Sequence, residues 1–339
     1  MDWNEDVEIA GVAVKAGQST DIYIELARLY DFTELSMPLR VVRGHKPGPT
    51  MFVSGAIHGD EIIGPEIIRR LLHDRHLKDL HGTLIAVPIV NVFGYNRMSR
   101  YLPDRRDLNR SFPGSPTGSL AARVAHLFFD EVVRKCQYGI DIHSAAIHRS
   151  NLPQIRACLD HPETERLARA FGVPVIINAK VRDGSLREAA EDIGQSVLLF
   201  EGGEGLRTDE SIVRKAVNGI LSVMQSVGML PDRVSLNNSH TPEAFIAKSS
   251  YWVRAPESGA LRFYKNLGTK VPKGARLGVI TDVFGGRKSV VRSPSSGIVI
   301  GRMNLPLVNK GDALFHIATF EDVERVFETI EQYDEVIYD

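Results

Sequence analysis

The sequence predicts an α/β fold in which a helix-covered sheet is followed by a smaller β-rich domain. From about Pro38 to Gly228, short apolar runs alternate with stretches of helical pattern. Near-continuous apolar strands separated by helices are typical of a sheet that helices cover on both faces. Beyond about Leu230 the helical pattern disappears, and Gly and Pro recur at short intervals along the chain. We therefore expect two domains, at residues 1–235 and 236–339.

The alternation in the first domain can be divided into individual elements. Pro65 is tolerated in the first turn of a helix, which supports a helix start there. Active-site residues of α/β sheets collect at the carboxyl ends of strands, so the residues after each strand are candidates for function. The pattern predicts strands at 50–57, 83–92, 138–143, 174–178 and 196–200, and helices at 65–77, 120–135, 163–171, 185–193 and 209–227.

The second domain contains an approximate internal duplication. The segment 255–259 (APESG) is echoed by 293–297 (SPSSG), and 271–274 (VPKG) is echoed by 308–312 (VNKGD). The pattern is similar to the half-barrels of biotinyl and lipoyl carrier domains. Such carriers need a lysine at the tip of a hairpin, but 280–286 (ITDVFGG) has none, and Lys288 stands in the wrong context. We expect an unmodified β-barrel, preceded by a polar linker at 232–242 and followed by a short helix and a final strand within 320–339.

Composition excludes several classes of function. The 41 basic residues nearly balance the 42 acidic ones, so nothing favours a nucleic-acid partner or a polybasic membrane patch. Two cysteines do not support a disulfide framework. The acidic N-terminus lacks the features of a signal peptide, and no apolar run is long enough to cross a bilayer. We expect a cytoplasmic protein with no membrane partner, and the sequence leaves a homo-oligomer open.

Three residues form a candidate metal site. His58 and Glu61 follow the predicted strand at 50–57, and His143 ends the strand at 138–143, so all three can meet at one edge of the sheet. Zinc accepts imidazole nitrogen and carboxylate oxygen, and a catalytic zinc has three protein ligands and one open position. Taken alone, a His three residues before a Glu is more often an exposed pair on a helix.

Further motifs make the chain resemble the succinylglutamate desuccinylase/aspartoacylase family, relatives of the zinc carboxypeptidases. They occur in the order found in that family and cover about residues 50–205. The resemblance implies a zinc-carboxypeptidase-like mixed sheet flanked by helices and a hydrolase, close to the N-acetyl-diaminobutyrate deacetylase-like members. The matching segments are 55–61 (GAIHGDE), 91–94 (NVFG), 100–101 (RY), 107–112 (DLNRSF), 141–143 (DIH) and 200–203 (FEGG).

The resemblance also implies a role for each matching residue. His58, Glu61 and His143 would bind one zinc ion per chain, and Glu201 would be the general base. Glu204 is the competing carboxylate, and a Glu that merely caps a turn before Gly202 is the structural alternative.

Four more residues receive expected roles in the same way. Arg100 would stabilise the oxyanion, although extra residues before Asp107 leave Arg106 open as a substitute. Asn109 and Arg110 would grip the carboxylate of the substrate. Asp107 would accept a hydrogen bond from the free nitrogen of His58, with simple loop capping as its alternative.

These features favour a zinc-dependent deacylase that cleaves the amide bond of a small N-acylated amino acid, of the deacetylase or desuccinylase type. A zinc carboxypeptidase acting on short peptides and a non-catalytic binding module remain as alternatives. Residues His148, Arg149 and Arg156 are expected in a loop, either lining the pocket or exposed to solvent. Trp252 and Tyr264 are expected to pack inside the barrel.

Overall fold

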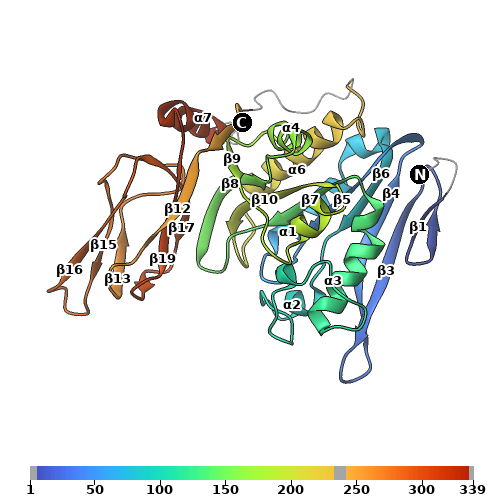
Figure 1. Cartoon of the computed structure of the whole chain (residues 1–339), viewed down its shortest axis with the longest axis horizontal. Helices are drawn as coiled ribbons and strands as arrows, with labels where there is room; N and C mark the ends of the chain where they lie inside the picture. Colours follow the sequence, from blue (N-terminus) through green and yellow to red (C-terminus); the bar gives the residue numbers. More distant parts are fainter. Residues whose placement is uncertain (1–5, 233–241, 336–339) are drawn as a thin grey trace.

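The computed structural model describes residues 6–232 and 242–335, and its centre is a large mixed sheet (Figure 1). The main strand order is β12-β19-β17-β8-β10-β7-β5-β6-β4-β3, with β9, β11 and β14 paired at its side. Strands β10, β7, β5 and β6 run parallel, whereas β4 and β3 run antiparallel to their neighbours. Strand β8 runs antiparallel to β10 and β17 but parallel to β9. The strands of this sheet before residue 205 are β3 (Ser19–Arg28), β4 (Glu34–Arg43), β5 (Lys46–Gly55), β6 (His81–Val87), β7 (Tyr138–His143), β8 (Arg149–Ala157), β9 (Val175–Asn178) and β10 (Ser196–Glu204).

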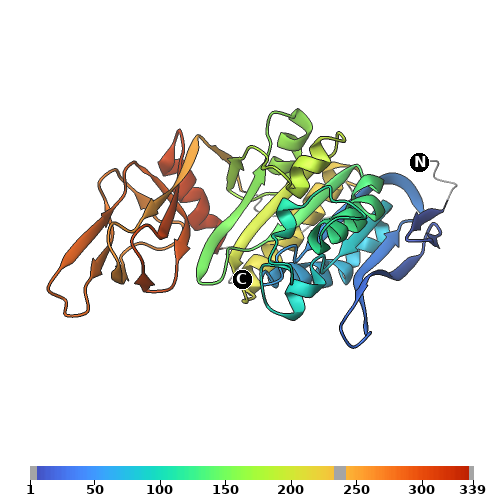
Figure 2. The ribbon, with the colours of Figure 1, turned by 60° about the horizontal axis from the view of Figure 1, so that its bottom comes forward.

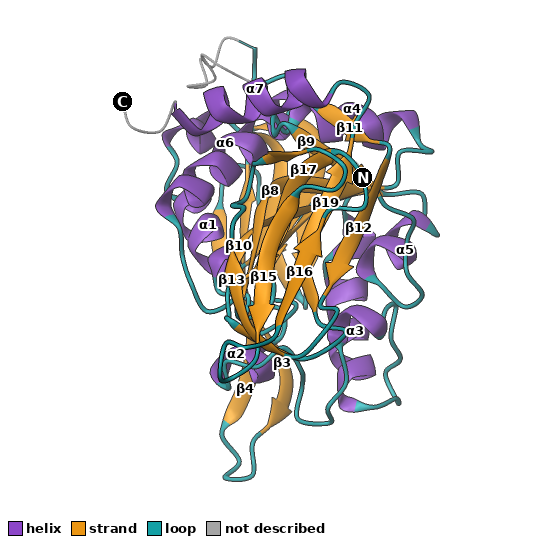
Figure 3. Ribbon diagram, turned by 90° about the vertical axis from the view of Figure 1, so that its left-hand side faces the viewer, coloured by secondary structure: helices purple, strands orange, loops and turns teal. Residues whose placement is uncertain are grey.

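Helices cover both faces of this sheet, as Figure 3 shows. Helices α1, α4 and α6 pack on one apolar core, and α3 and α5 pack on the other. Polar caps fix where several helices begin: Ser119 accepts the amide of Ala122 at α3, and Asp209 accepts the amides of two residues of α6. The helices are α1 (Ile63–Leu72), α2 (Val92–Asn96), α3 (Leu120–Glu131), α4 (Pro162–Ala170), α5 (Leu186–Glu191), α6 (Glu210–Ser226) and α7 (Val323–Glu335).

The predicted mixture of strands and helices agrees with this architecture, and the differences have local causes. The strand predicted at 83–92 ends at Val87, because Pro88 has no amide hydrogen to donate to a ladder. The helix predicted at 65–77 ends at Leu72, where Asp74 caps a separate 3₁₀ turn, Arg75–Asp79. The segment expected as a loop around Arg149 is strand β8, so that expectation was wrong.

The duplication in the second half of the chain is visible in its strand pairing. Gly259 begins β13 and Gly297 begins β17; a Cβ at Gly259 would lie 2.3 Å from the carbonyl oxygen of Thr281, and one at Gly297 would lie 2.3 Å from that of Ala318. Strand β13 pairs with β18, and β14 pairs with β17, so each half donates a short strand to the other. The bounds are β11 (Phe245–Ala247), β12 (Ser249–Arg254), β13 (Gly259–Phe263), β14 (Lys270–Val271), β15 (Arg276–Thr281), β16 (Lys288–Arg292), β17 (Gly297–Met303), β18 (Leu307–Val308) and β19 (Ala313–Thr319).

This C-terminal part is rich in strands and lies at one end of the molecule, with the N-terminus towards the other end (Figure 2). Strands β16-β15-β13-β18 form a sheet of their own. Strand β17, however, pairs with β8 at residues 149–151, so the central sheet continues across residue 235. The division into domains 1–235 and 236–339 and the barrel type therefore remain predictions.

The two ends of the chain add small elements. Strands β1 (Val7–Ile9) and β2 (Val12–Val14) form a two-stranded sheet near the N-terminus. Helix α7 takes up most of the C-terminal tail. Residues 233–241 of the linker expected at 232–242, and the last four residues of the tail, lie outside the described residues, so the linker and the final strand stay predictions. Among the described helices, none is long and apolar enough to span a bilayer.

Candidate metal centre

Two adjacent parallel strands bring the candidate ligands together. Strand β5 ends at Gly55 and is followed by His58 and Glu61, while its neighbour β7 ends at His143 itself. The intervening Ala56 is fully buried with φ of +50°, a conformation that non-glycine residues seldom adopt and that is common at functional sites. Gly59 is required here because a Cβ would lie 2.0 Å from the backbone of Gly94.

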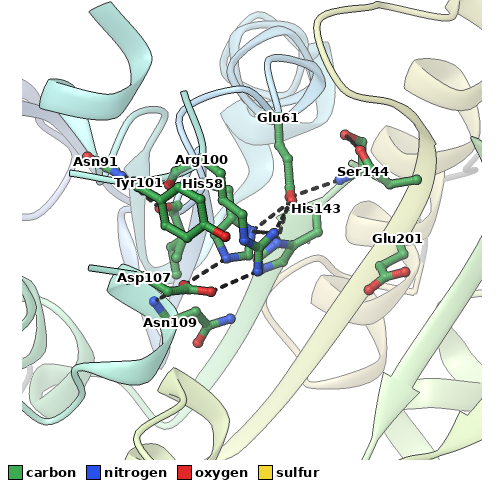
Figure 4. A network of polar contacts seen from close by, with 12 residues as sticks. His58, Glu61, Asn91, Arg100, Tyr101, Asp107, Asn109, His143, Ser144 and Glu201 are labelled. Carbon is green, nitrogen blue, oxygen red and sulfur yellow. Dashed lines mark hydrogen bonds and ion pairs between the residues drawn. The ribbon is translucent and has the colours of Figure 1, made fainter. Parts of the chain in front are cut away.

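The ligand atoms converge on one another, as Figure 4 shows. The Nδ1 atom of His58 lies 2.7 Å from Oε1 of Glu61, and Nδ1 of His143 lies 2.7 Å from its Oε2. The three potential ligand atoms lie within 4.8 Å of one another, and all three residues are buried. The backbone amide of Ser144 donates to Oε2 of Glu61 over 3.2 Å.

The outer nitrogens of both imidazoles contact carboxylates. The Nε2 atom of His58 lies 3.1 Å from Oδ1 of Asp107, and Nε2 of His143 lies 2.7 Å from Oδ2 of Asp141. A carboxylate that accepts the Nε2 proton leaves a lone pair on Nδ1 of a neutral imidazole, which is the usual arrangement at metal sites. Two lone pairs facing the Glu61 carboxylate repel it unless protons or a metal cation lie between, so the donor set fits a cation such as zinc.

The electrostatics of the cluster support the same conclusion. Burial disfavours the charged form of Glu61, yet the positive charges on His58 and His143 outweigh burial and hold the pKa of Glu61 well below its usual range. Burial likewise acts against a charged His143, but Asp141 and Glu61 raise its pKa well above the usual value. The buried carboxylates therefore stabilise positive charge at this position, whether carried by protons or by a metal.

Arg100 is the candidate oxyanion group that lies in the site. Its Nη1 atom is 3.1 Å from Nδ1 of His58 and 3.4 Å from Oε1 of Glu61, while Nη2 donates to Asp107 over 2.9 Å. The side chain of Arg106 is instead 64% exposed, and its nearest carboxylate is that of Asp104. Of the two alternatives that the sequence leaves open, only Arg100 lines the pocket.

Glu201 lies beside the ligand cluster on the next strand. In the pairing of β10 with β7, Glu201 lies opposite His143. Side chains of residues that lie opposite each other in neighbouring strands point to the same face of the sheet. Asn151 donates from Nδ2 to Oε2 of Glu201 over 2.5 Å, and Nε of Arg156 lies 3.3 Å from Oε1. Glu204 is held elsewhere, by the side chain of Asn304, and does not line the pocket.

Asn109 and Arg110 both line the pocket, but their contacts differ. Asn109 is buried, and its Oδ1 accepts the backbone amide of Leu186 over 2.9 Å, so it anchors the start of α5. The side chain of Arg110 is more exposed and donates to the backbone carbonyl of Asn109. Asn109 thus fixes a pocket wall, while Arg110 is available to a ligand.

The pocket has a volume of about 200 Å³ and includes residues that the sequence did not place there. Trp252 of β12, expected in the barrel interior, lines the pocket and stacks on His316 with ring centroids 4.7 Å apart. Asn151 comes from strand β8. Arg187 lies in the first turn of α5, where the helix dipole disfavours a cation, and that misplaced charge is the only sequence signal that could have identified it.

Comparison with known proteins finds relatives both by sequence and by structure. The chain is 28% identical over 293 residues, covering 83% of this chain and 85% of the relative, to the N-alpha-acetyl-L-2,4-diaminobutyric acid deacetylase of Halomonas elongata. A succinylglutamate desuccinylase/aspartoacylase structure from Rhodobacter sphaeroides superposes with a TM-score of 0.79 at 25% identity, covering 90% of this chain and 95% of that one.

The product-bound ectoine utilization protein EutE (DoeB) of Ruegeria pomeroyi has the same fold. Its TM-score is 0.81 at 24% identity, covering 93% of this chain and 99% of that chain. The profile of the succinylglutamate desuccinylase/aspartoacylase catalytic domain matches residues 47–227, more than half of the chain, and includes the ligand cluster and Glu201. The protein belongs to the succinylglutamate desuccinylase/aspartoacylase family.

Proposed function

We propose that the protein is a zinc-dependent deacylase that hydrolyses the amide bond of a small N-acylated amino acid. The observation that carries this proposal is the buried His58–Glu61–His143 cluster beside the carboxylate of Glu201. A zinc ion held by the cluster would polarise the amide carbonyl and lower the pKa of a water molecule towards about 7. Family membership supports the reaction class, which is acyl transfer to water.

The residues around the cluster supply the remaining chemistry. Glu201 takes the proton from the attacking water and returns it to the leaving amine, as a general base and then a general acid. Asn151 and Arg156 hold both of its carboxylate oxygens, which fixes its orientation towards the pocket. The guanidinium of Arg100 stabilises negative charge that develops on the carbonyl oxygen.

The charge of the pocket indicates which substrates it binds. Within the described residues, Arg100 and Arg156 form salt bridges with carboxylates, but no salt bridge reaches the other four arginines. Burial and the nearby Arg156 lower the pKa of Arg187, so the positive charges of these two arginines repel each other in the pocket. A substrate with a second carboxylate would relieve this repulsion. The six arginines that line the pocket are Arg100, Arg110, Arg149, Arg156, Arg182 and Arg187.

A substrate panel tests the reaction and this preference together. The N-acetyl and N-succinyl derivatives of aspartate, glutamate, alanine and 2,4-diaminobutyrate should be hydrolysed only after zinc is restored to chelator-treated protein. We expect the aspartate and glutamate derivatives to be the best substrates, although the Halomonas elongata relative is a deacetylase of N-alpha-acetyl-L-2,4-diaminobutyric acid. Metal-independent hydrolysis would overturn the proposed function, whereas a preference for the diaminobutyrate derivative would overturn only the charge argument.

Replacing Arg110 with alanine should raise KM about 10- to 100-fold on the best substrate. A hydrogen bond to a charged group contributes about 1.5–3 kcal/mol, and the partial exposure of Arg110 keeps the effect within that range. Arg110→Lys should recover part of the loss, since lysine lacks the planar fork. Arg123→Ala, an exposed arginine outside the pocket, is the matched control. An unchanged KM in Arg110→Ala would exclude a carboxylate clamp.

A further inference from the structure

A second group of metal-ligating side chains lies outside the pocket. Cys158 follows the last residue of β8, His161 precedes α4, and Glu191 is the last residue of α5. The ligand atoms of these three residues lie within 4.8 Å of one another. None of the three lines the pocket of the first cluster, and none was singled out by the sequence.

The distances within this group are close to those of a tetrahedral metal site. The Nε2 atom of His161 lies 3.0 Å from Oε1 of Glu191, and Sγ of Cys158 lies 3.5 Å from the same oxygen. A tetrahedral zinc ion with bonds of about 2.0–2.3 Å separates its ligand atoms by about 3.3–3.7 Å. Two of the three separations are therefore near the tetrahedral range, and the ligand atoms of Cys158 and His161 lie within 4.8 Å of each other.

The surroundings of the group favour a cation. Glu191 stands at the C-terminal end of α5, where the helix dipole is negative, and no basic residue occupies the last turn. Burial and the charges of Glu191 and Asp160 raise the pKa of the Cys158 thiol, so these acidic groups oppose a free thiolate. A bound divalent metal would neutralise this negative charge and stabilise the thiolate.

The backbone that carries the ligands is already fixed. The amide of Leu159 donates to Oδ1 of Asn178 over 3.2 Å, which holds the turn between Cys158 and His161. The side chain of His161 is 58% exposed and that of Glu191 is 29% exposed, so an ion can enter from solvent and retain a water ligand. Thiolate, imidazole and carboxylate together are a ligand set suited to zinc and cobalt rather than to calcium or magnesium.

We propose that Cys158, His161 and Glu191 form a second binding site for zinc or a similar borderline-soft divalent metal. Binding replaces the thiol proton with the metal and releases that proton to solvent. The ion joins the end of β8 to the end of α5, the helix whose first turn carries Arg187 of the pocket. The site is independent of the proposed catalytic zinc, because the two share no ligand.

Titration of metal-free protein with Co²⁺ tests the proposal. The wild-type chain should bind two equivalents, and one of them should produce the near-ultraviolet thiolate-to-cobalt charge-transfer band. Cys158→Ser should bind one equivalent and lose the band. Cys136→Ala, which removes the only other thiol, should keep both equivalents and the band. His58→Ala should lose one equivalent and keep the band.

The outcomes separate this site from the proposed catalytic site. A wild-type chain without the thiolate band, or a Cys158→Ser chain that retains it, would overturn the second site. Glu191→Gln keeps the thiol and the volume of the side chain, so it tests the site even if Cys158→Ser folds poorly. We expect Glu191→Gln to weaken the equivalent that gives the band and to leave the other unchanged. Equal weakening of both would overturn the proposal.

Discussion

Replacing Glu201 with glutamine should lower kcat by about 10²–10⁴-fold on the best substrate, which is the usual contribution of general acid–base catalysis. Glutamine keeps the volume of the side chain but cannot accept a proton. The amide oxygen of the substituted side chain can still lie near Asn151 or Arg156, so the strand should remain in place. KM should change little, because the proton transfer belongs to the transition state. Steady-state kinetics and thermal unfolding measured together check the prediction.

Glu204→Gln is the matched control for this variant. Glu204 lies on the same strand but accepts hydrogen bonds from the backbone amide of His148 and the side chain of Asn304. Losing these contacts should cost stability rather than kcat. If Glu204→Gln were inactive and Glu201→Gln active, the general base would have to be reassigned to Glu204.

The candidate ligand cluster could be located from the sequence because its residues follow buried strands. The apolar run before His143 matches β7 at both ends, and the run before His58 identifies β5. Parallel strands then bring their carboxyl ends to one edge without further information. The strand ends explain why the three residues meet, but their assignment as metal ligands also needed the family resemblance, because a His three residues before a Glu is weak evidence by itself.

Strand β8 could not be predicted, because its sequence lacks the signals of a strand. The segment contains Pro153 and several polar residues and has no apolar alternation. It forms a strand because β10, β9 and β17 supply backbone partners from three other parts of the chain. The polar residues Asn151 and Arg156 of β8 contact Glu201. Because the pocket needs polar residues at these positions, the apolar alternation that usually indicates a strand is missing.

The contribution of the C-terminal part to the pocket was also hidden from the sequence. Trp252 is a large apolar residue of the kind that usually packs inside a domain, so its residue type did not indicate a place in the pocket. The pairing of β17 with β8 brings the strand of Trp252, β12, close to the site. His316 packs against it, and burial together with Arg156 lowers the pKa of His316 to about 3, so this histidine is neutral. A neutral imidazole can stack on the indole without adding another positive charge to an arginine-rich pocket.

Replacing His143 with alanine should remove the catalytic metal and lower the rate at least about 10³-fold. A metal ion contributes several kcal/mol to a hydrolytic transition state, and about 4 kcal/mol corresponds to this factor. The variant removes the imidazole contacts of Asp141 and of Oε2 of Glu61, both of which stay buried, so a lower melting temperature is also expected. Zinc content after dialysis, hydrolysis rate and thermal unfolding are the measurements.

Two comparisons decide how the result for His143→Ala is interpreted. His126→Ala removes an imidazole from the surface of α3, where it contacts Asp130, and should retain both zinc and activity. Asp141→Asn keeps His143 but weakens the hydrogen bond that orients it, and loss of such a partner typically costs 10–100-fold in metal affinity or activity. The expected order of activity is therefore His126→Ala, then Asp141→Asn, then His143→Ala. A His143→Ala chain that kept its catalytic zinc and its rate would rule out this residue as a ligand, and the activity would then have to come from a different arrangement of the pocket.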